Sequence, residues 1–311
     1  MLQGALSYVQ RLDVALIYVG FALVLGSLAS AKWLSGATSM WSDLVASQSL
    51  QFRRLGLALS VAALGFSVWL EAAVMAEVPL TQAGPTVLKL ARNTQFGHVA
   101  ATGFAAWVLA LAFGWAPARL TAARSVMLVL AVATAFWSRS ANSHAGAKNG
   151  LWSLAACVDW IHLVAACLWV GMVLLAARLK LPSEAATAQE RAEATLWVGS
   201  LSSLATVSLA AVVLAGVFNV WHAVGDWNLL LGSVYGKALL VKLLLVAVAA
   251  ALGGYNRFRV LPGVFELLRQ PGTNSRDWKR TLVRVLRIEA VVLLLVLVAA
   301  SILGGSEPLD A

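Results

Sequence analysis

The stretch WSLAACVDWIHLVAACLWVGMVLLAA, residues 152–177, decides the fold that we expect for this protein. Asp159 and His162 are its two strongly polar side chains, and the rest of the stretch is dominated by Leu, Ala and Val. A helix of this length, rising about 1.5 Å per residue, is longer than the roughly 30 Å of hydrocarbon in a bilayer. Apolar and polar residues do not alternate strictly, as they would in a membrane strand. We therefore predict a transmembrane helix that carries ionisable side chains at membrane depth.

The same apolar pattern recurs along the whole chain of 311 residues, which is 60% hydrophobic and only 12% charged. A soluble domain carries about 25% charged residues, so this composition is typical of a protein that lies in a lipid bilayer. We predict an all-α, polytopic membrane helix bundle that forms a single integral domain over residues 1–311. The eight predicted spans are approximately residues 12–31, 56–77, 94–115, 121–142, 152–177, 199–221, 236–254 and 285–304. The longest polar connection, 255–284, is expected to contain a short amphipathic helix near 260–268 on the membrane surface.

The basic residues predict how the bundle is oriented. Of 23 Lys and Arg residues, sixteen fall in or beside the odd-numbered connections, and six fall on the other side. Because basic connections stay in the cytoplasm, we expect both termini to be periplasmic. The formal net charge of +9 is then explained by cytoplasmic loops. Clusters of aromatic and basic residues typical of RNA-binding surfaces are absent, so we expect no nucleic-acid partner.

All four histidines of the chain lie at or inside the ends of apolar stretches. They are His98, His144, His162 and His222, and the predicted orientation places all of them in the outer half of the bilayer. Ionisable side chains at this depth usually mark the path of an ion, a substrate or a cofactor. His162 and His98 would lie deepest, with His144 nearer the surface. His222, next to Trp221, equally fits a residue of the interfacial aromatic belt.

Several other polar or soft side chains fall near the histidines. Asp159 precedes His162 by three positions, so both share a helix face, and its carboxylate is expected to accept the imidazole N–H and orient the ring. The intramembrane charges Lys242 and Glu289 are expected at different depths, so we do not pair them with each other. Each is expected to have a structural partner of its own, which for Lys242 could be Asp159 or a helix terminus. The remaining candidate pathway residues are Glu71 and Met75 near the entrance, the amides of Asn142 and Asn219 at the depth of the histidines, and Cys167 and Met172 on an inward exit.

Five motifs in order resemble those of one family. They are Ser143-His144-Ala145, the helix Asp159–Gly171 with its D-x-x-H-L and W-x-G elements, Leu201–Asn219, Tyr235–Lys242, and Tyr255-Asn256-Arg257 with the final helix. Together, over about residues 90–310, they resemble the copper resistance protein D (CopD) family. The resemblance implies a multi-pass protein of the bacterial inner membrane that takes up copper from the periplasm to the cytoplasm. It also implies a periplasmic copper donor similar to CopC, which would be a separate protein here.

With copper as the expected ion, His98 and His162 are the predicted central ligands, because imidazole binds copper in either oxidation state. His144 and His222 are the predicted entrance ligands. No P-loop or other ATP-binding motif is present, so we expect transport by a gradient or by passive facilitation. We expect no enzymatic activity. Two alternatives stay open. One is a redox protein that binds haem between His98 and His162, and the other is a sensor or assembly factor that holds copper without moving it.

Overall fold

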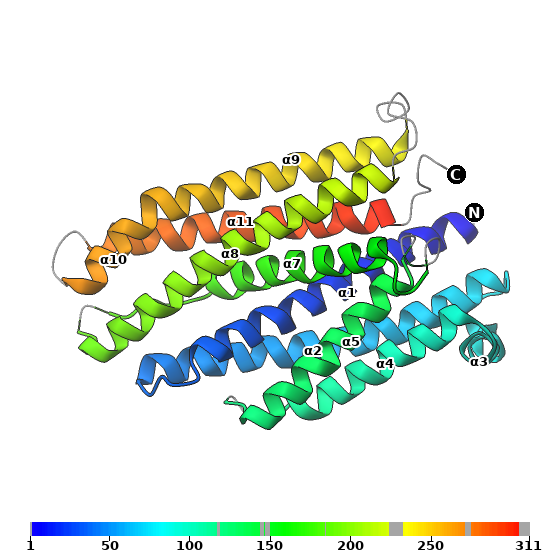
Figure 1. Ribbon diagram of the computed structural model, residues 1–311, viewed down its shortest axis with the longest axis horizontal. Coiled ribbons are helices and arrows are strands. Elements are labelled where there is room, and N and C mark those ends of the chain that lie inside the picture. The colour runs from blue at the N-terminus through cyan, green and yellow to red at the C-terminus, as the bar shows by residue number, and fades with distance from the viewer. Residues whose placement is uncertain are drawn as a thin grey trace.

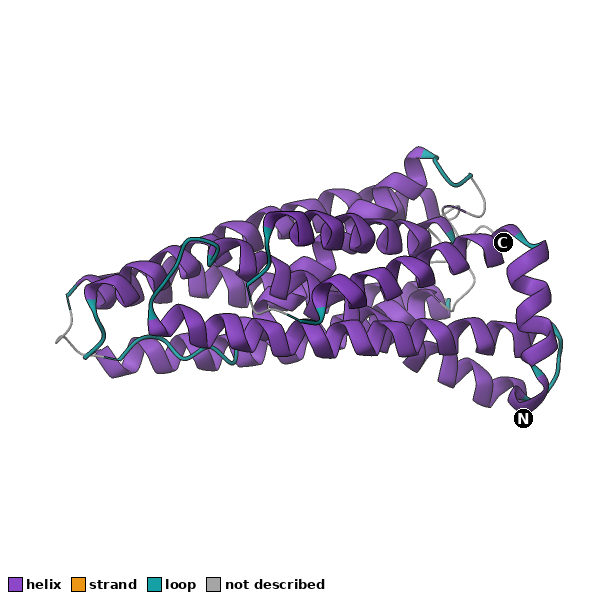
Figure 2. Ribbon diagram, turned by 90° about the horizontal axis from the view of Figure 1, so that it is seen from below, coloured by secondary structure: helices purple, strands orange, loops and turns teal. Residues whose placement is uncertain are grey.

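The computed structural model describes residues 2–116, 119–143, 146, 150–183, 185–223, 233–270 and 275–304. All regular structure in these residues is helical (Figure 2). Eight of the described helices are long and apolar enough to cross a membrane, which confirms the predicted all-α membrane fold. Their principal elements are α1 (Leu2–Trp33), α2 (Met40–Met75), α4 (Gln95–Gly114), α5 (Ala122–Ala141), α7 (Leu154–Ala176), α8 (Ala188–Ala223), α9 (Val234–Tyr255) and α11 (Ser275–Gly304).

The bundle is built around α1 and α7. Helix α1 packs most extensively against α2 and α7, while α4 pairs with α5, α8 with α7, and α9 with α11. Figure 1 shows that α1 begins and α11 ends at the same end of the bundle, which we call the terminal end. The opposite end, where α1 ends and α11 begins, carries Arg119 on the connection between α4 and α5 and Lys279 near the start of α11, and we call it the basic end.

The α1 and α7 backbones touch where two glycines face each other. A Cβ atom added to Gly171 would lie 1.8 Å from the carbonyl oxygen of Ala22, and one added to Gly26 would lie 2.3 Å from the carbonyl carbon of Gly171. Small residues allow membrane helices to approach this closely, and the resulting van der Waals contact stabilises their association. The close crossing fixes α7 at the centre of the bundle.

Several helices continue beyond the apolar stretches that predicted them. Helix α2 begins at Met40 rather than near 56, and α8 begins at Ala188 rather than near 199. Arg53 therefore lies inside α2, fully buried, and its Nε donates a hydrogen bond of 2.7 Å to the carbonyl of Gly114. Arg54 makes the equivalent 2.7 Å bond to Trp115. The last carbonyls of a helix lack helical partners, so these two arginines satisfy the end of α4.

The predicted amphipathic helix near 260–268 is present as α10 (Leu261–Arg269). It continues α9 through a π-helical turn, η3 (Asn256–Val260), and packs against α8 and α11 with Leu261 and Val264 buried.

The sequence did not predict the short helices η1 (Leu80–Gln82) and α3 (Gly84–Asn93) between α2 and α4. Pro85 lies in the first turn of α3, a position where proline's missing N–H costs no helical hydrogen bond.

Candidate functional site

A cavity of about 1200 Å³ runs from the terminal end toward the middle of the bundle, between α1, α2, α5, α7, α8, α9 and α11. Near the terminal end its wall includes Gln10 and Leu303, and at its deep end it includes Trp169 and Val246. Most of the wall is apolar. Besides His162, the described lining residues include three carboxylic acids and three strong bases. The acids are Asp13, Glu71 and Asp159, and the bases are Arg11, Arg139 and Lys242.

His162 lines this cavity from α7, and its ring is held by the backbone of α8. Nδ1 lies 3.1 Å from the carbonyl oxygen of Val212. A carbonyl only accepts hydrogen bonds, so Nδ1 carries the proton of the neutral ring and Nε2 keeps its lone pair. Nε2 is therefore the atom through which His162 can bind a metal ion. The expectation that Asp159 orients the ring is corrected: Val212 does so, because α8 passes beside the ring of His162.

Asp159 instead connects three helices. Its Oδ2 lies 2.9 Å from the hydroxyl of Ser140 on α5, and its Oδ1 lies 3.5 Å from Nδ2 of Asn219 on α8. The ammonium group of Lys242 on α9 is near enough to interact electrostatically with both Asp159 and His162, although no ion pair within 4.0 Å joins these described residues. The predicted neighbourhood of Lys242 and Asp159 is thus present, as a longer-range attraction.

A second polar group, which the sequence analysis missed, lines the cavity wall formed by α1, α2 and α5. Asp13 is 4% exposed and is hydrogen-bonded to Ser67, and Arg139 lies near both Asp13 and Glu71. The guanidinium of Arg139 also lies 5.8 Å from the ring centroid of Tyr18.

The feature of the sequence that could have predicted this group was Asp13, an acidic residue inside the first predicted span. Of the predicted entrance residues, Glu71 belongs to this group, with Oε2 3.5 Å from Nε2 of Gln10.

His98 does not join His162. Its side chain is exposed, outside the cavity, and its Nε2 lies 3.0 Å from the carbonyl oxygen of Arg92 at the end of α3. Helix α4 packs against α2 and α5 rather than against the cavity side of α7. The expected pair of central histidines, for copper or for haem, is therefore not assembled in this structure.

The other predicted residues are divided between the cavity and its surroundings. Asn142 lines the cavity and donates a 3.2 Å hydrogen bond to the carbonyl of Phe96. Met75 is 58% exposed and lies outside the cavity. His144 lies outside the described residues. His222 belongs to the last turn of α8, and its side chain lies outside the part of the chain that the structure describes.

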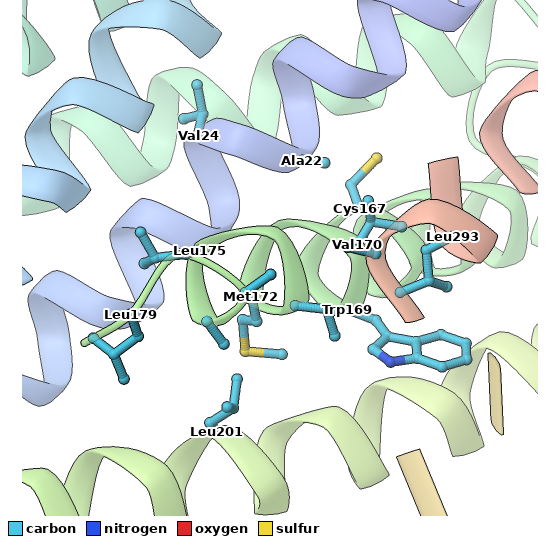
Figure 3. Close-up of a cluster of buried hydrophobic side chains, with 14 of the residues drawn as sticks. Ala22, Val24, Cys167, Trp169, Val170, Met172, Leu175, Leu179, Leu201 and Leu293 are labelled. Atoms are coloured by element: carbon cyan, nitrogen blue, oxygen red, sulfur yellow. The ribbon is translucent and has the colours of Figure 1, made fainter. Parts of the chain in front are cut away.

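Of the two sulfur residues predicted to lie on an inward exit, only Cys167 reaches the cavity wall. Figure 3 shows Cys167 directed toward Ala22 of α1, whereas Met172 points toward Leu201 of α8. Both are buried, and Sγ of Cys167 lies 3.8 Å from the carbonyl oxygen of Tyr18. Within the described residues, no group of three or more His, Cys, Asp and Glu side chains is arranged to hold a metal ion. A metal bound by His162 would therefore take few ligands from these four residue types in the described part of the chain.

The sequence of this chain is similar to those of known proteins. Residues 195–303 match the family model of copper resistance protein D. Over 302 residues the chain is 29% identical to a copper resistance protein D of Pseudomonas syringae pv. tomato, covering 92% of this chain and 91% of that relative. No solved structure matches. The family model covers Val212, Asn219 and Lys242 of the cavity, whereas Asp159 and His162 precede it. The chain is therefore similar to copper resistance protein D over residues 195–303 and over most of its length at 29% identity, which confirms the resemblance inferred from its sequence motifs.

Proposed function

We propose that this protein transports copper ions across the bacterial inner membrane, from the periplasm to the cytoplasm. The observation that carries the proposal is His162, a neutral imidazole with an unprotonated Nε2 on the wall of a deep cavity inside a membrane bundle. Imidazole binds copper in both oxidation states. The name of the relative, copper resistance protein D, supports copper as the ion.

The cavity suggests the route. It is lined by residues of the terminal end, which the distribution of basic residues predicts to be periplasmic, and it reaches His162 about one third of the way along α7. Asp13 and Glu71 offer carboxylate oxygens near that entrance, beside Arg139, and Asp159 offers them near His162. Copper would come from a separate periplasmic donor similar to CopC. With no ATP-binding motif in the sequence, the driving force would be a gradient.

Two histidines of the same chain make a matched test of copper binding. We expect His162→Ala to abolish copper binding by the purified protein, and His98→Ala to leave it intact because His98 is exposed outside the cavity. Isothermal titration calorimetry and metal analysis after desalting measure both. Unchanged stoichiometry and affinity in the His162 variant would contradict the proposed ligand.

Flux separates a transporter from a protein that only holds copper. Proteoliposomes containing the protein and an internal copper-sensitive dye should report copper entry, and the His162→Ala protein should show the background rate of empty liposomes. Binding without flux would favour a sensor or assembly factor. The optical spectrum of the same purified protein checks for haem, whose Soret band would contradict the proposal.

A further inference from the structure

The cavity-facing side of α7 continues past His162 to a tryptophan. Asp159, His162, Ala166 and Trp169 are spaced by three, four and three residues, so they follow one another along a single helix face. All four line the cavity. Trp169 lies seven residues beyond His162, about 10 Å deeper at helical rise. This face of α7 therefore leads from the proposed copper ligand to the floor of the cavity.

The indole of Trp169 touches a carboxylate that lies outside the cavity. Its Nε1 donates a 3.2 Å hydrogen bond to Oε1 of Glu289 on α11. In Figure 3 the ring lies beside Leu293, one turn along α11 from Glu289, while Cys167 turns away toward α1. Leu293 lines the cavity and Glu289 does not. The ring of Trp169 therefore separates His162 from Glu289.

Glu289 is a costly residue at this position. It is 2% exposed inside a predicted membrane span, and no Lys, Arg or His lies within 4.0 Å of it in the described residues. Intramembrane carboxylates without a basic partner commonly belong to an ion or proton path. The backbone of α9 comes close to the carboxylate, since a Cβ atom added to Gly253 would lie 3.3 Å from Oε1.

Asn256 provides a second polar group beside Glu289. It is 5% exposed and its side chain is close enough to Glu289 to interact with the carboxylate, yet in the described part of the protein neither its amide oxygen nor its amide nitrogen has a partner at hydrogen-bond geometry. It opens the π-helical turn η3 at the end of α9. Buried amides are nearly always hydrogen-bonded, and π-turns are frequent at functional sites. A buried amide without a hydrogen-bond partner of good geometry, next to a carboxylate without a basic partner, can bind a cation.

We propose that Glu289 and Asn256 form a second, transient cation site on the basic-end side of Trp169, through which copper leaves the cavity. This inference rests on the proposed copper transport. Carboxylate and amide oxygens are harder donors than imidazole and hold copper less strongly. Weak binding suits an exit, because a conducting path needs sites that bind enough to admit the ion and little enough to release it. The indole N–H occupies only Oε1, so Oε2 of Glu289 can accept the ion while Trp169 stays in place.

The test uses the full-length protein in proteoliposomes with copper as the probe. Glu289→Gln keeps the size of the side chain and an oxygen acceptor for Trp169, but removes the charge. We expect copper binding at His162 to be unchanged, and the copper flux to fall roughly tenfold or more, as expected when a charged ligand is lost. Asn256→Leu should lower the flux in the same direction. The matched control is Glu266→Gln on α10, an exposed carboxylate whose loss should not change the flux.

Two further variants distinguish a cation site from a structural hydrogen bond. Trp169→Phe keeps a ring but frees Oε1, so the flux should be retained or increased. Glu289→Asp keeps the charge and should retain more flux than Glu289→Gln, and thermal unfolding checks that each variant is folded. Wild-type flux in Glu289→Gln, or an equal loss in Trp169→Phe and Glu289→Gln, would overturn the second site alone. Absence of flux in the wild-type protein would instead overturn the proposed function.

Discussion

The Nδ1 atom of His162 lies 3.1 Å from the carbonyl oxygen of Val212, so the backbone of one helix orients the ring of another. Gly216 is four residues beyond Val212, one turn along α8, and a Cβ atom added there would lie 3.4 Å from Cε1 of His162. A methyl group at Gly216 would just contact the imidazole, so a side chain larger than alanine would meet the ring. The space beside the proposed ligand is therefore limited by the small size of this residue on α8.

Filling this space should displace the ring. We expect Gly216→Leu to lower the copper affinity by roughly tenfold, because a shift of the ligand by about 1 Å is enough to disturb a metal site. Titration calorimetry of the purified protein measures the affinity. Gly199→Leu on the same helix is the control, since no atom lies within 4 Å of a Cβ added at Gly199. Equal affinities in the two variants would show that Gly216 does not position the ring.

The charges of Asp159 and Lys242 should be coupled. Asp159→Asn removes the carboxylate that attracts the Lys242 ammonium, and we expect the free energy of unfolding to fall by about 1–3 kcal/mol. The double variant Asp159→Asn/Lys242→Met leaves no lone charge and should be more stable than Asp159→Asn alone. Thermal unfolding of the four proteins in a double-mutant cycle gives the coupling, expected to be about 0.5–3 kcal/mol. Additive effects would mean that the two charges do not interact.

The α1–α7 crossing should not tolerate a larger residue. Gly171→Ala places a methyl group against the carbonyl of Ala22 and forces the two backbones apart, with an expected loss of about 1–3 kcal/mol. Gly254→Ala is the matched control, because a Cβ at Gly254 meets no atom within 4 Å. Unfolding temperatures in detergent compare the two variants. A Gly171 variant as stable as the Gly254 variant would contradict the close approach.

The two cysteines should react differently with thiol reagents. Cys157 is exposed and Cys167 is fully buried. We expect a maleimide to label one thiol per folded protein in detergent, and to label none in Cys157→Ala. Mass spectrometry of the labelled protein counts the modified thiols, and denatured wild-type protein, with two labels, serves as the positive control. Labelling of folded Cys157→Ala would show that Cys167 is reachable through the cavity.

The sequence predicted the fold well because long apolar stretches have few alternatives in a bilayer. All eight predicted spans correspond to helices. Their ends were less accurate, since hydropathy reports where a helix is apolar and not where its hydrogen bonds stop. Arg53 illustrates this: the residue looks like part of a polar connection, yet it is buried inside α2 and satisfies the end of α4.

The candidate site was predictable only in part. Counting residues from the end of each predicted span gives the depth of a side chain in the membrane. This count correctly placed His162, Asp159 and Asn219 at similar depths. Depth does not say which way a side chain points around its helix or which helices are neighbours. His98 has a suitable depth, but α4 packs elsewhere in the bundle. The contact of Trp169 with Glu289 joins residues 120 positions apart and depends on that unpredicted arrangement.

The walls of the cavity have a consequence for the electrical balance of the proposed copper transport. Among the described lining residues, the acids Asp13, Glu71 and Asp159 are matched by the bases Arg11, Arg139 and Lys242. In their ionised forms these six groups sum to zero, and the neutral ring of His162 adds nothing. A copper ion that reaches His162 therefore introduces positive charge that these groups do not neutralise, in a region where such charge is expensive. Each passage must then either move net charge across the membrane, and so respond to its voltage, or be accompanied by an anion or by the departure of protons.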